Sequence, residues 1–150
     1  MTQCGACEMP TSDRAPDVLV DTSVAVALLV ADHASHDAVA AALGSRRLGL
    51  AGHAAFETYS VLTRLPPPAR RSPAAVSTLI DANFPASRFP SPTAVARLMR
   101  DAAGMGISGG SMYDALVGIT AVIHALPLAT RDRAALVTYQ ALGVRVEPIS

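Results

Sequence analysis

The sequence predicts one three-layer α/β/α domain with a mainly parallel central sheet. Its 150 residues match the size of a single compact domain, and 51% of them are hydrophobic, which is enough for a core without disulfide bonds. Short apolar runs alternate along the chain with longer helical patterns. Strands that alternate with helices are typical of a parallel sheet covered on both faces.

Strands are predicted where short runs of apolar and β-branched residues occur. The first run leads directly into Asp21, and the last run alternates apolar with charged residues. A possible edge strand lies between prolines over 84–90. The four main strands are predicted over 18–21, 48–51, 127–130 and 144–147.

Helices are predicted between these strands, and capping residues mark several of their ends. Thr22 or Ser23 can cap the first helix, and the three prolines at 66–68 end the third. Ser-Pro pairs at 72–73 and 91–92 begin the fourth and the fifth. The predicted helices span 22–31, 37–43, 53–64, 73–83, 92 to near 104, 111–125 and 132–142.

The charge composition excludes several classes of function. Twelve arginines, no lysine and twelve acidic residues give a net charge of zero. This balance argues against a generally basic surface for nucleic acid. The absence of lysine excludes Schiff-base chemistry, the phosphate-binding loop that depends on lysine, and phospho-receiver chemistry.

The first 16 residues are expected to form a disordered leader before the domain at 17–150. Cys4 and Cys7 form a Cys-x-x-Cys pair there, but no second pair is spaced to complete a zinc site. We therefore expect dispensable, reduced thiols, which fit the cytoplasm. The apolar run over 18–31 is too short to span a membrane and is interrupted by Asp21, so we expect a soluble protein.

Four acidic residues are expected at the carboxyl ends of the parallel strands, where such sheets bind ligands. Asp21 closes the first strand, and Glu57 lies one turn into the helix after the second. Asp114 is near the start of the helix that leads into the third strand, and Asp132 follows that strand by two residues.

Each of these acids also has an ordinary structural explanation. Asp21 and Asp132 are suited to capping helices, Glu57 to a solvated helix face, and Asp114 to the positive end of a helix dipole. Four carboxylates at one edge of a sheet would nevertheless repel one another strongly without a cation. Oxygen ligands of this kind are those that Mg²⁺ or Mn²⁺ takes, and such ions activate water for attack on phosphodiesters.

The motifs around these acids resemble those of the PIN-domain ribonucleases. The similar segments are Val-Leu-Val-Asp-Thr-Ser at 18–23, Glu57, Tyr-Asp-Ala-Leu at 113–116 and Thr-Arg-Asp-Arg at 130–133. The chain looks most like the VapC toxins of VapBC toxin–antitoxin pairs. The resemblance covers about residues 17–149, and the leader is the one departure from the family pattern.

This resemblance implies a PIN-like fold and a function. Asp21, Glu57, Asp114 and Asp132 match the family's catalytic metal site, and Thr22, Ser23 and Thr130 match its supporting hydroxyls. The implied activity is Mg²⁺- or Mn²⁺-dependent endonucleolytic cleavage of structured or single-stranded RNA, such as tRNA or rRNA. Cleavage would inhibit translation, and a cognate VapB-like antitoxin would neutralise it.

Other residues are expected to support RNA binding and assembly. Arg131 and Arg133 flank Asp132 and are our first candidates for contacts with RNA phosphates, ahead of arginines such as Arg46. The histidines at 33, 36, 53 and 124 are expected to be surface or packing residues. The apolar helices around 22–43 and 53–64 predict a homodimer, as does the family resemblance.

Two other functions compete with the ribonuclease. A non-catalytic RNA-binding PIN-like domain should lack at least one of the metal carboxylates, and none is missing here. A metal-dependent phosphatase of another α/β class would need Asp-x-Asp at the first strand and a lysine. The sequence has Asp-Thr-Ser at 21–23 and no lysine.

Overall fold

The computed structural model describes residues 16–150 and confirms the parallel sheet. Its strands are β1 (Val18–Val20), β2 (Leu48–Leu50), β3 (Leu128–Thr130) and β4 (Val146–Pro148), in the spatial order β2-β1-β3-β4. All three pairings are parallel, so the strands' carboxyl ends meet at one edge. The register aligns Val20 with Leu50 on one side and with Ala129 on the other.

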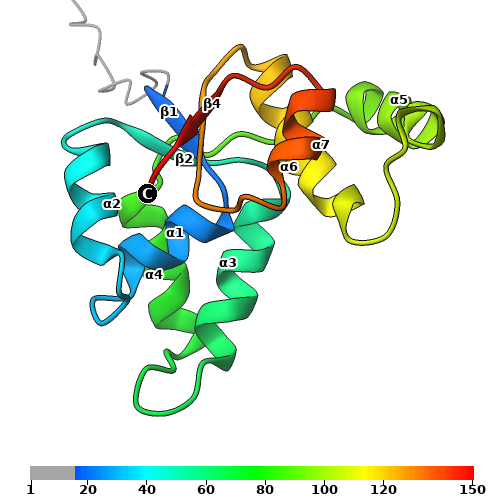
Figure 1. The fold of residues 1–150 in the computed structure, drawn as a ribbon. Coiled ribbons are helices and arrows are strands. Elements are labelled where there is room, and N and C mark those ends of the chain that lie inside the picture. Colours follow the sequence, from blue (N-terminus) through cyan, green and yellow to red (C-terminus); the bar gives the residue numbers. More distant parts are fainter. Residues whose placement is uncertain (1–15) are drawn as a thin grey trace, which may run out of the picture.

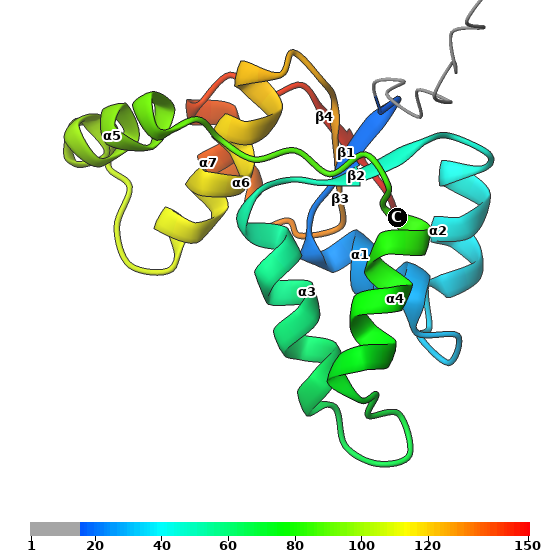
Figure 2. The same ribbon diagram turned by 180° about the vertical axis from the view of Figure 1, so that it is seen from behind.

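Helices cover this sheet in two groups, which gives the predicted three-layer α/β/α architecture. The first four helices gather on one side of the molecule and the later ones on the other, as both views show (Figures 1 and 2). The helices are α1 (Thr22–Leu29), α2 (His36–Leu43), α3 (His53–Arg64), α4 (Pro73–Asn83), α5 (Pro92–Asp101), α6 (Ser111–Ile123) and α7 (Leu136–Ala141), with a 3₁₀ turn at Ala103–Met105.

The core lies around the three inner strands. Every residue of β1, β2 and β3 is buried, whereas β4 is partly exposed at its edge of the sheet. Tyr139 of α7 is the largest of the fully buried side chains and packs into this core. Burial on both faces explains why these strands do not alternate apolar with polar residues; Thr130, at the end of β3, is their one polar side chain.

The predicted edge strand over 84–90 is wrong as a strand, although the segment does run beside β2. Ala86 and Arg88 donate backbone hydrogen bonds to Leu48 and Leu50, but only one bridge, between Ala51 and Arg88, is formed. The Leu50 N–H donates to the Ser87 hydroxyl at 3.0 Å instead of to a backbone carbonyl, and this interrupts the hydrogen-bond ladder between β2 and the segment. The close approach also requires glycine at 49, because a Cβ there would lie 2.2 Å from the Ala86 carbonyl oxygen.

One predicted helix cap and one predicted helix start are also corrected. Asp21, rather than Thr22 or Ser23, is the N-cap of α1, and its side chain accepts from the Val24 N–H. The last helix begins at Leu136 rather than at 132. Its entry is a turn in which the Asp132 carboxylate accepts from the Ala134 and Ala135 N–H groups.

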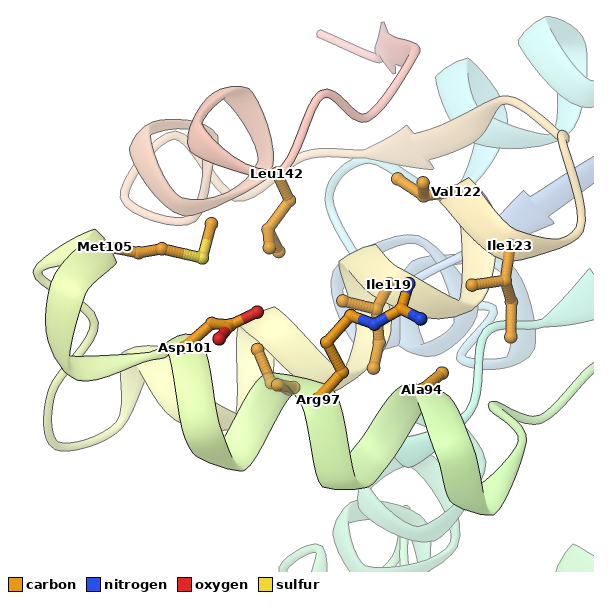
Figure 3. A pocket seen from close by; sticks show the side chains of 9 residues that line it. Ala94, Arg97, Asp101, Met105, Ile119, Val122, Ile123 and Leu142 are labelled. Atoms are coloured by element: carbon orange, nitrogen blue, oxygen red, sulfur yellow. The ribbon is translucent and has the colours of Figure 1, made fainter.

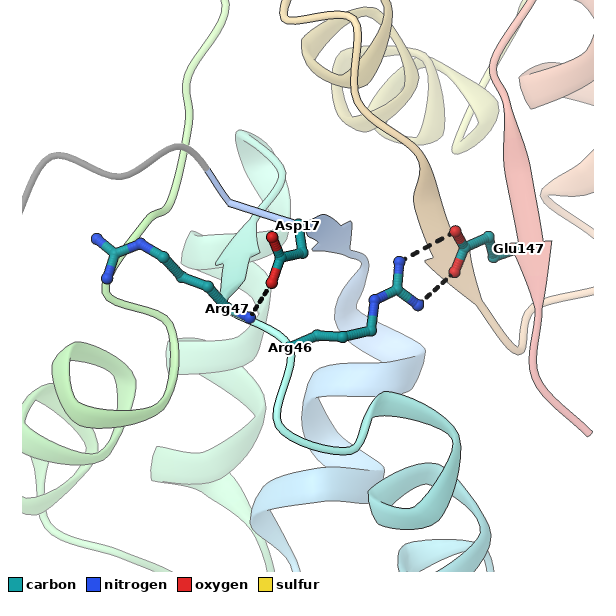
Figure 4. A network of polar contacts seen from close by, with 4 residues as sticks. All are labelled: Asp17, Arg46, Arg47 and Glu147. Carbon is teal, nitrogen blue, oxygen red and sulfur yellow. Dashed lines mark hydrogen bonds and ion pairs between the residues drawn. The ribbon is translucent and has the colours of Figure 1, made fainter.

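Arg46, one of the candidate phosphate-binding arginines, instead forms an ion pair with Glu147. Arg46, in the loop before β2, donates both terminal guanidinium nitrogens to Glu147 of β4, at 2.7 and 3.1 Å (Figure 4). These hydrogen bonds lower the pKa of the Glu147 carboxyl. The neighbouring Arg47 N–H donates to Asp17 at 2.8 Å. Arg46 is therefore engaged in holding the edges of the sheet together, at a distance from the strands' carboxyl ends.

The expected leader lies outside the described residues except for Pro16, as do Cys4 and Cys7. Within the described part of the chain, no helix has the length and apolar character that crossing a membrane requires.

Candidate active site

A small pocket at the carboxyl ends of the strands brings the four predicted carboxylates together. Its volume is about 40 Å³, which is room for a cation or a few water-sized groups. Asp21 comes from the end of β1, Glu57 from α3, Asp114 from α6 and Asp132 from the turn after β3. The pocket is lined by Asp21, Thr22, Ser23, Glu57, Asp114, Val117, Asp132 and Tyr139.

Asp21 is the most buried of the four, with 4% of its surface exposed. Its Oδ1 accepts from the Ser23 hydroxyl at 2.5 Å and from the Val24 N–H at 3.3 Å. Its Oδ2 accepts from the hydroxyls of Thr130 and Tyr139. Burial raises the pKa of this carboxyl, and the four hydrogen bonds oppose the rise. The capping and site interpretations of Asp21 are thus compatible, because one side chain serves both.

Two predicted supporting hydroxyls connect β3 to α1 through Asp21. Ser23 donates to Asp21 and accepts from the Arg131 N–H at 2.8 Å. Thr130 donates to Asp21 and accepts from the Asp132 N–H at 3.0 Å. The turn that carries Asp132 is therefore fixed relative to Asp21.

Glu57 is held by two neighbours on opposite oxygens. The third predicted hydroxyl, that of Thr22, donates to Oε2 at 2.8 Å. His53, one turn earlier on α3, places its Nε2 3.4 Å from Oε1. The Glu57 side chain is 42% exposed, so it stands at the open side of the pocket.

The pKa of Asp114 reflects the negative charge that surrounds it in the pocket. Its pKa is raised to about 6 by burial and, in decreasing order, by the negative charges of Asp132, Glu57 and Asp21. The four carboxylates are thus near enough to repel one another. A cation among them would remove that repulsion.

The donor set fits Mg²⁺ or Mn²⁺, although the carboxylates are not gathered around one point. The pocket offers carboxylate oxygens, and these hard ligands suit either ion. Among residues 16–150, no three acidic, histidine or cysteine side chains converge closely enough to hold an ion as they stand. Glu57 and Asp132 are the more accessible of the four carboxylates.

The two arginines beside Asp132 line a neighbouring hollow rather than the carboxylate pocket. Arg131 and Arg133, with Thr130 and Asp132, border a space of about 110 Å³. Arg131 donates from Nη2 to Ser35 at 2.5 Å, and its buried Nε has no hydrogen-bond partner among the described residues. Arg133 is exposed.

A different hollow, between α5 and α6, lies away from this chemistry. It measures about 210 Å³ and is apolar apart from Arg97 and Asp101 of α5 (Figure 3). None of the four predicted carboxylates lines it. It is not a place for a divalent cation.

A comparison with known families agrees with the fold. The model of the PIN domain matches residues 18–139, which contain all four carboxylates. The chain belongs to the PIN-domain family. This PIN domain is 46% identical over 131 residues to Ribonuclease VapC27 of Mycobacterium tuberculosis, a match that covers 87% of this chain and 96% of the relative. It is 44% identical over 132 residues to Ribonuclease VapC40 of the same species, covering 87% and 97%. The chain is therefore a VapC-like PIN domain.

Solved structures show the same PIN-domain fold. FitAcB from Neisseria gonorrhoeae aligns with a TM-score of 0.59 and 22% identity, over 86% of this chain and 95% of the other. FitAB bound to an IR36 DNA fragment also aligns with a TM-score of 0.59, at 20% identity, over 87% and 94%. At these identities the likeness supports the architecture alone.

Sequence reasoning missed Tyr139, which lines the pocket, and the contact of His53 with Glu57. Tyr139 donates to Asp21 at 3.1 Å, and its burial, followed by the negative charge of Asp21, raises the pKa of its phenol above the ordinary value. It lies within the last predicted helix, and no local pattern linked it to a residue 118 positions away. His53 was expected to be a surface or packing residue, and it lies beside Glu57. Its spacing of four residues from Glu57 on one helix was the available signal.

Proposed function

We propose that this PIN domain is a cytoplasmic endoribonuclease toxin that depends on Mg²⁺ or Mn²⁺ and inhibits translation. The observation that carries the proposal is the shared pocket, which is lined by all four carboxylates. The relatives named as VapC ribonucleases support the same reaction class. The substrate would be structured or single-stranded RNA, with tRNA and rRNA as the classes to test.

In this proposal the four carboxylates would hold the cation, and other side chains would orient them. Asp21, Glu57, Asp114 and Asp132 supply the ligands, and a bound Mg²⁺ or Mn²⁺ would activate water and stabilise charge at the phosphate. The hydroxyls on Asp21 and Glu57 keep those carboxylates aimed at the pocket.

Arg131 and Arg133 would contact the RNA phosphates that flank the cleaved bond. Their hollow adjoins the carboxylate pocket and shares Asp132 with it. Arg133 is exposed beside Asp132, and its guanidinium is the planar bidentate donor that suits a phosphate.

Removal of divalent ions should abolish RNA cleavage, and Mg²⁺ or Mn²⁺ should restore it. No cysteine or histidine set among the described residues replaces the carboxylates as ligands. The measurement is digestion of total RNA in EDTA and after addition of each ion, with duplex DNA as a parallel substrate. Full cleavage in EDTA would refute the metal mechanism, and preferential cutting of duplex DNA would refute the RNA specificity.

We also propose a small VapB-like antitoxin as the natural inhibitor. The acidic pocket favours a basic antitoxin side chain, which would compete with the cation for the carboxylates. Co-expression with the cognate antitoxin should suppress RNA cleavage, as measured on purified complex and on the toxin freed from it. Equal cleavage by both preparations would contradict this role.

A homodimer is the third part of the proposal, and an aromatic patch on and beside α3 supports it. The patch consists of Phe56 (64% exposed), Tyr59 (40%), Phe89 (51%) and Tyr113 (52%). No comparably exposed large hydrophobic residue is found over 22–43, where apolar helices were also expected to need cover. Exposed aromatic side chains gathered in this way are typical of surfaces that are covered in stable interfaces.

In this proposal the patch packs against the same patch of a second copy. Phe56 and Phe89 meet edge to face at 6.2 Å, and beside them is a hollow of about 260 Å³ lined by Tyr59 and Ile80. In a dimer with a twofold axis, the rings of each copy would pack into the hollow of the other.

Phe89→Arg should convert the dimer to a monomer because it places a charge inside the apolar interface. Light scattering at micromolar concentration measures the mass of the wild type and the variant. Val137→Arg is the matched control, since Val137 is 74% exposed on α7, outside the patch. A wild type that is strictly monomeric, or a Phe89→Arg protein that stays dimeric, would be evidence against this interface.

A further inference from the structure

Glu57 can serve as a cation ligand only if neighbouring groups restrict its side chain. It is a long side chain, 42% exposed, whose rotamer freedom must be restricted before its carboxylate can hold an ion. Asp21 is instead buried and fixed by four hydrogen bonds. What restrains Glu57 therefore bears directly on how well the pocket binds an ion.

Two contacts restrain it, one on each carboxylate oxygen. Thr22 donates to Oε2 at 2.8 Å, and the Nε2 of His53 lies 3.4 Å from Oε1. Each carboxylate oxygen has two lone-pair sites. Thr22 and His53 therefore leave acceptor capacity on both oxygens for a cation.

His53 is itself held in place by a ring of another helix. Its imidazole stacks on Tyr113 with ring centroids 4.8 Å apart and ring planes at 20°. Tyr113 is on α6, immediately before Asp114. The stacked pair thus joins the start of α3, which carries Glu57, to the start of α6, which carries Asp114.

We infer that His53 is a positioning residue that holds Glu57 toward the pocket for the divalent cation. The imidazole, set by Tyr113, fixes the side chain of Glu57 relative to Asp114. The inference rests on the proposed function and adds a residue to it. The competing role is plain packing between the two helices, which a phenyl ring would fulfil equally well.

Two substitutions test the contribution of the His53 ring and that of its Nε2 atom separately. His53→Phe keeps a flat ring against Tyr113 and removes Nε2. His53→Gln removes the ring but places an amide nitrogen where Nε2 was. The control is His124→Phe, because His124 lies at the other end of α6 and contacts the Phe89 carbonyl.

Mn²⁺ binding to RNA-free protein, followed by electron paramagnetic resonance titration, is the measurement. We expect His53→Phe to bind Mn²⁺ about tenfold more weakly than wild type, which is typical of losing a group that orients a ligand. His53→Gln should recover most of the affinity, and His124→Phe should match wild type. Melting curves in EDTA establish that each variant is folded.

The outcomes distinguish this inference from the proposed function. Wild type and His53→Phe with equal Mn²⁺ affinity would overturn the role of His53 and leave the metal site standing. Equal losses in His53→Phe and His53→Gln would also overturn it, because the nitrogen would then not matter. A wild type that binds no Mn²⁺ would overturn both.

Discussion

Asp21→Asn is expected to lower RNA cleavage by about a thousandfold or more. Asp21 is the buried centre of the pocket, and both of its oxygens are aligned by hydroxyl groups. Asparagine keeps the size and one acceptor oxygen but removes the charge that a divalent cation needs. Cations of this kind contribute several kcal/mol to transition-state stabilisation, and each 1.36 kcal/mol changes the rate tenfold.

The measurement is kcat/KM on an RNA substrate at saturating Mg²⁺, with folding checked by circular dichroism. Asp37→Asn is the matched control, since Asp37 is an exposed aspartate in the first turn of α2, outside the pocket. It should retain wild-type activity. Substantial cleavage by Asp21→Asn would return Asp21 to a purely structural role as the cap of α1.

The elements that could be predicted from sequence are those determined by neighbouring residues. The strand before Asp21 is an uninterrupted apolar run, and the starts of α4 and α5 are marked by serine caps whose hydroxyls accept from Ala75 and Ala94 N–H groups. The convergence of the four acids also followed, because parallel strands place their carboxyl ends at one edge.

The parts that could not be predicted depend on contacts between distant segments. The segment at 84–90 looked like a strand, but a single side chain, Ser87, takes the hydrogen bond that would extend its ladder. Tyr139 reaches Asp21 only because α7 folds back against α1's cap. Arg131 flanks Asp132 in sequence, yet its guanidinium turns to Ser35, 96 residues earlier. Sequence proximity places a residue at the site but does not determine where its side chain points.

The metal-free pocket is predicted to be a source of instability, and Asp114 is the residue on which to test it. Its folded-state pKa of about 6 lies above the ordinary 3.8. Between these values the folded protein keeps a proton that the unfolded chain releases. The contribution of Asp114 to the free energy of unfolding therefore falls as pH rises through this window, and the full penalty is present above pH 6.

Asp114→Asn removes this penalty, so the metal-free variant should be more stable than wild type at pH 7.5. After allowance for solvent screening, the free energy of unfolding should rise by on the order of 1 kcal/mol, which corresponds to about 3 °C in Tm. The advantage should shrink as pH is lowered from 6 toward 4, because wild-type Asp114 then becomes protonated. Thermal melts of both proteins in EDTA across this range, with Asp37→Asn as control, measure the difference.

Addition of a divalent cation should make wild type more stable than Asp114→Asn, the reverse of the order expected in EDTA. An ion that binds only the folded state raises its stability by about 2.7 kcal/mol at a concentration one hundred times its Kd. Wild type should therefore gain Tm in Mn²⁺, and Asp114→Asn should gain little, since it has lost one ligand charge. The ordinary role of an acid at a helix start predicts the opposite in EDTA, where loss of the charge near the amino end of α6 would destabilise the protein. An Asp114→Asn protein that melts below wild type in EDTA at pH 7.5 would thus assign Asp114 to the helix rather than to a cation site.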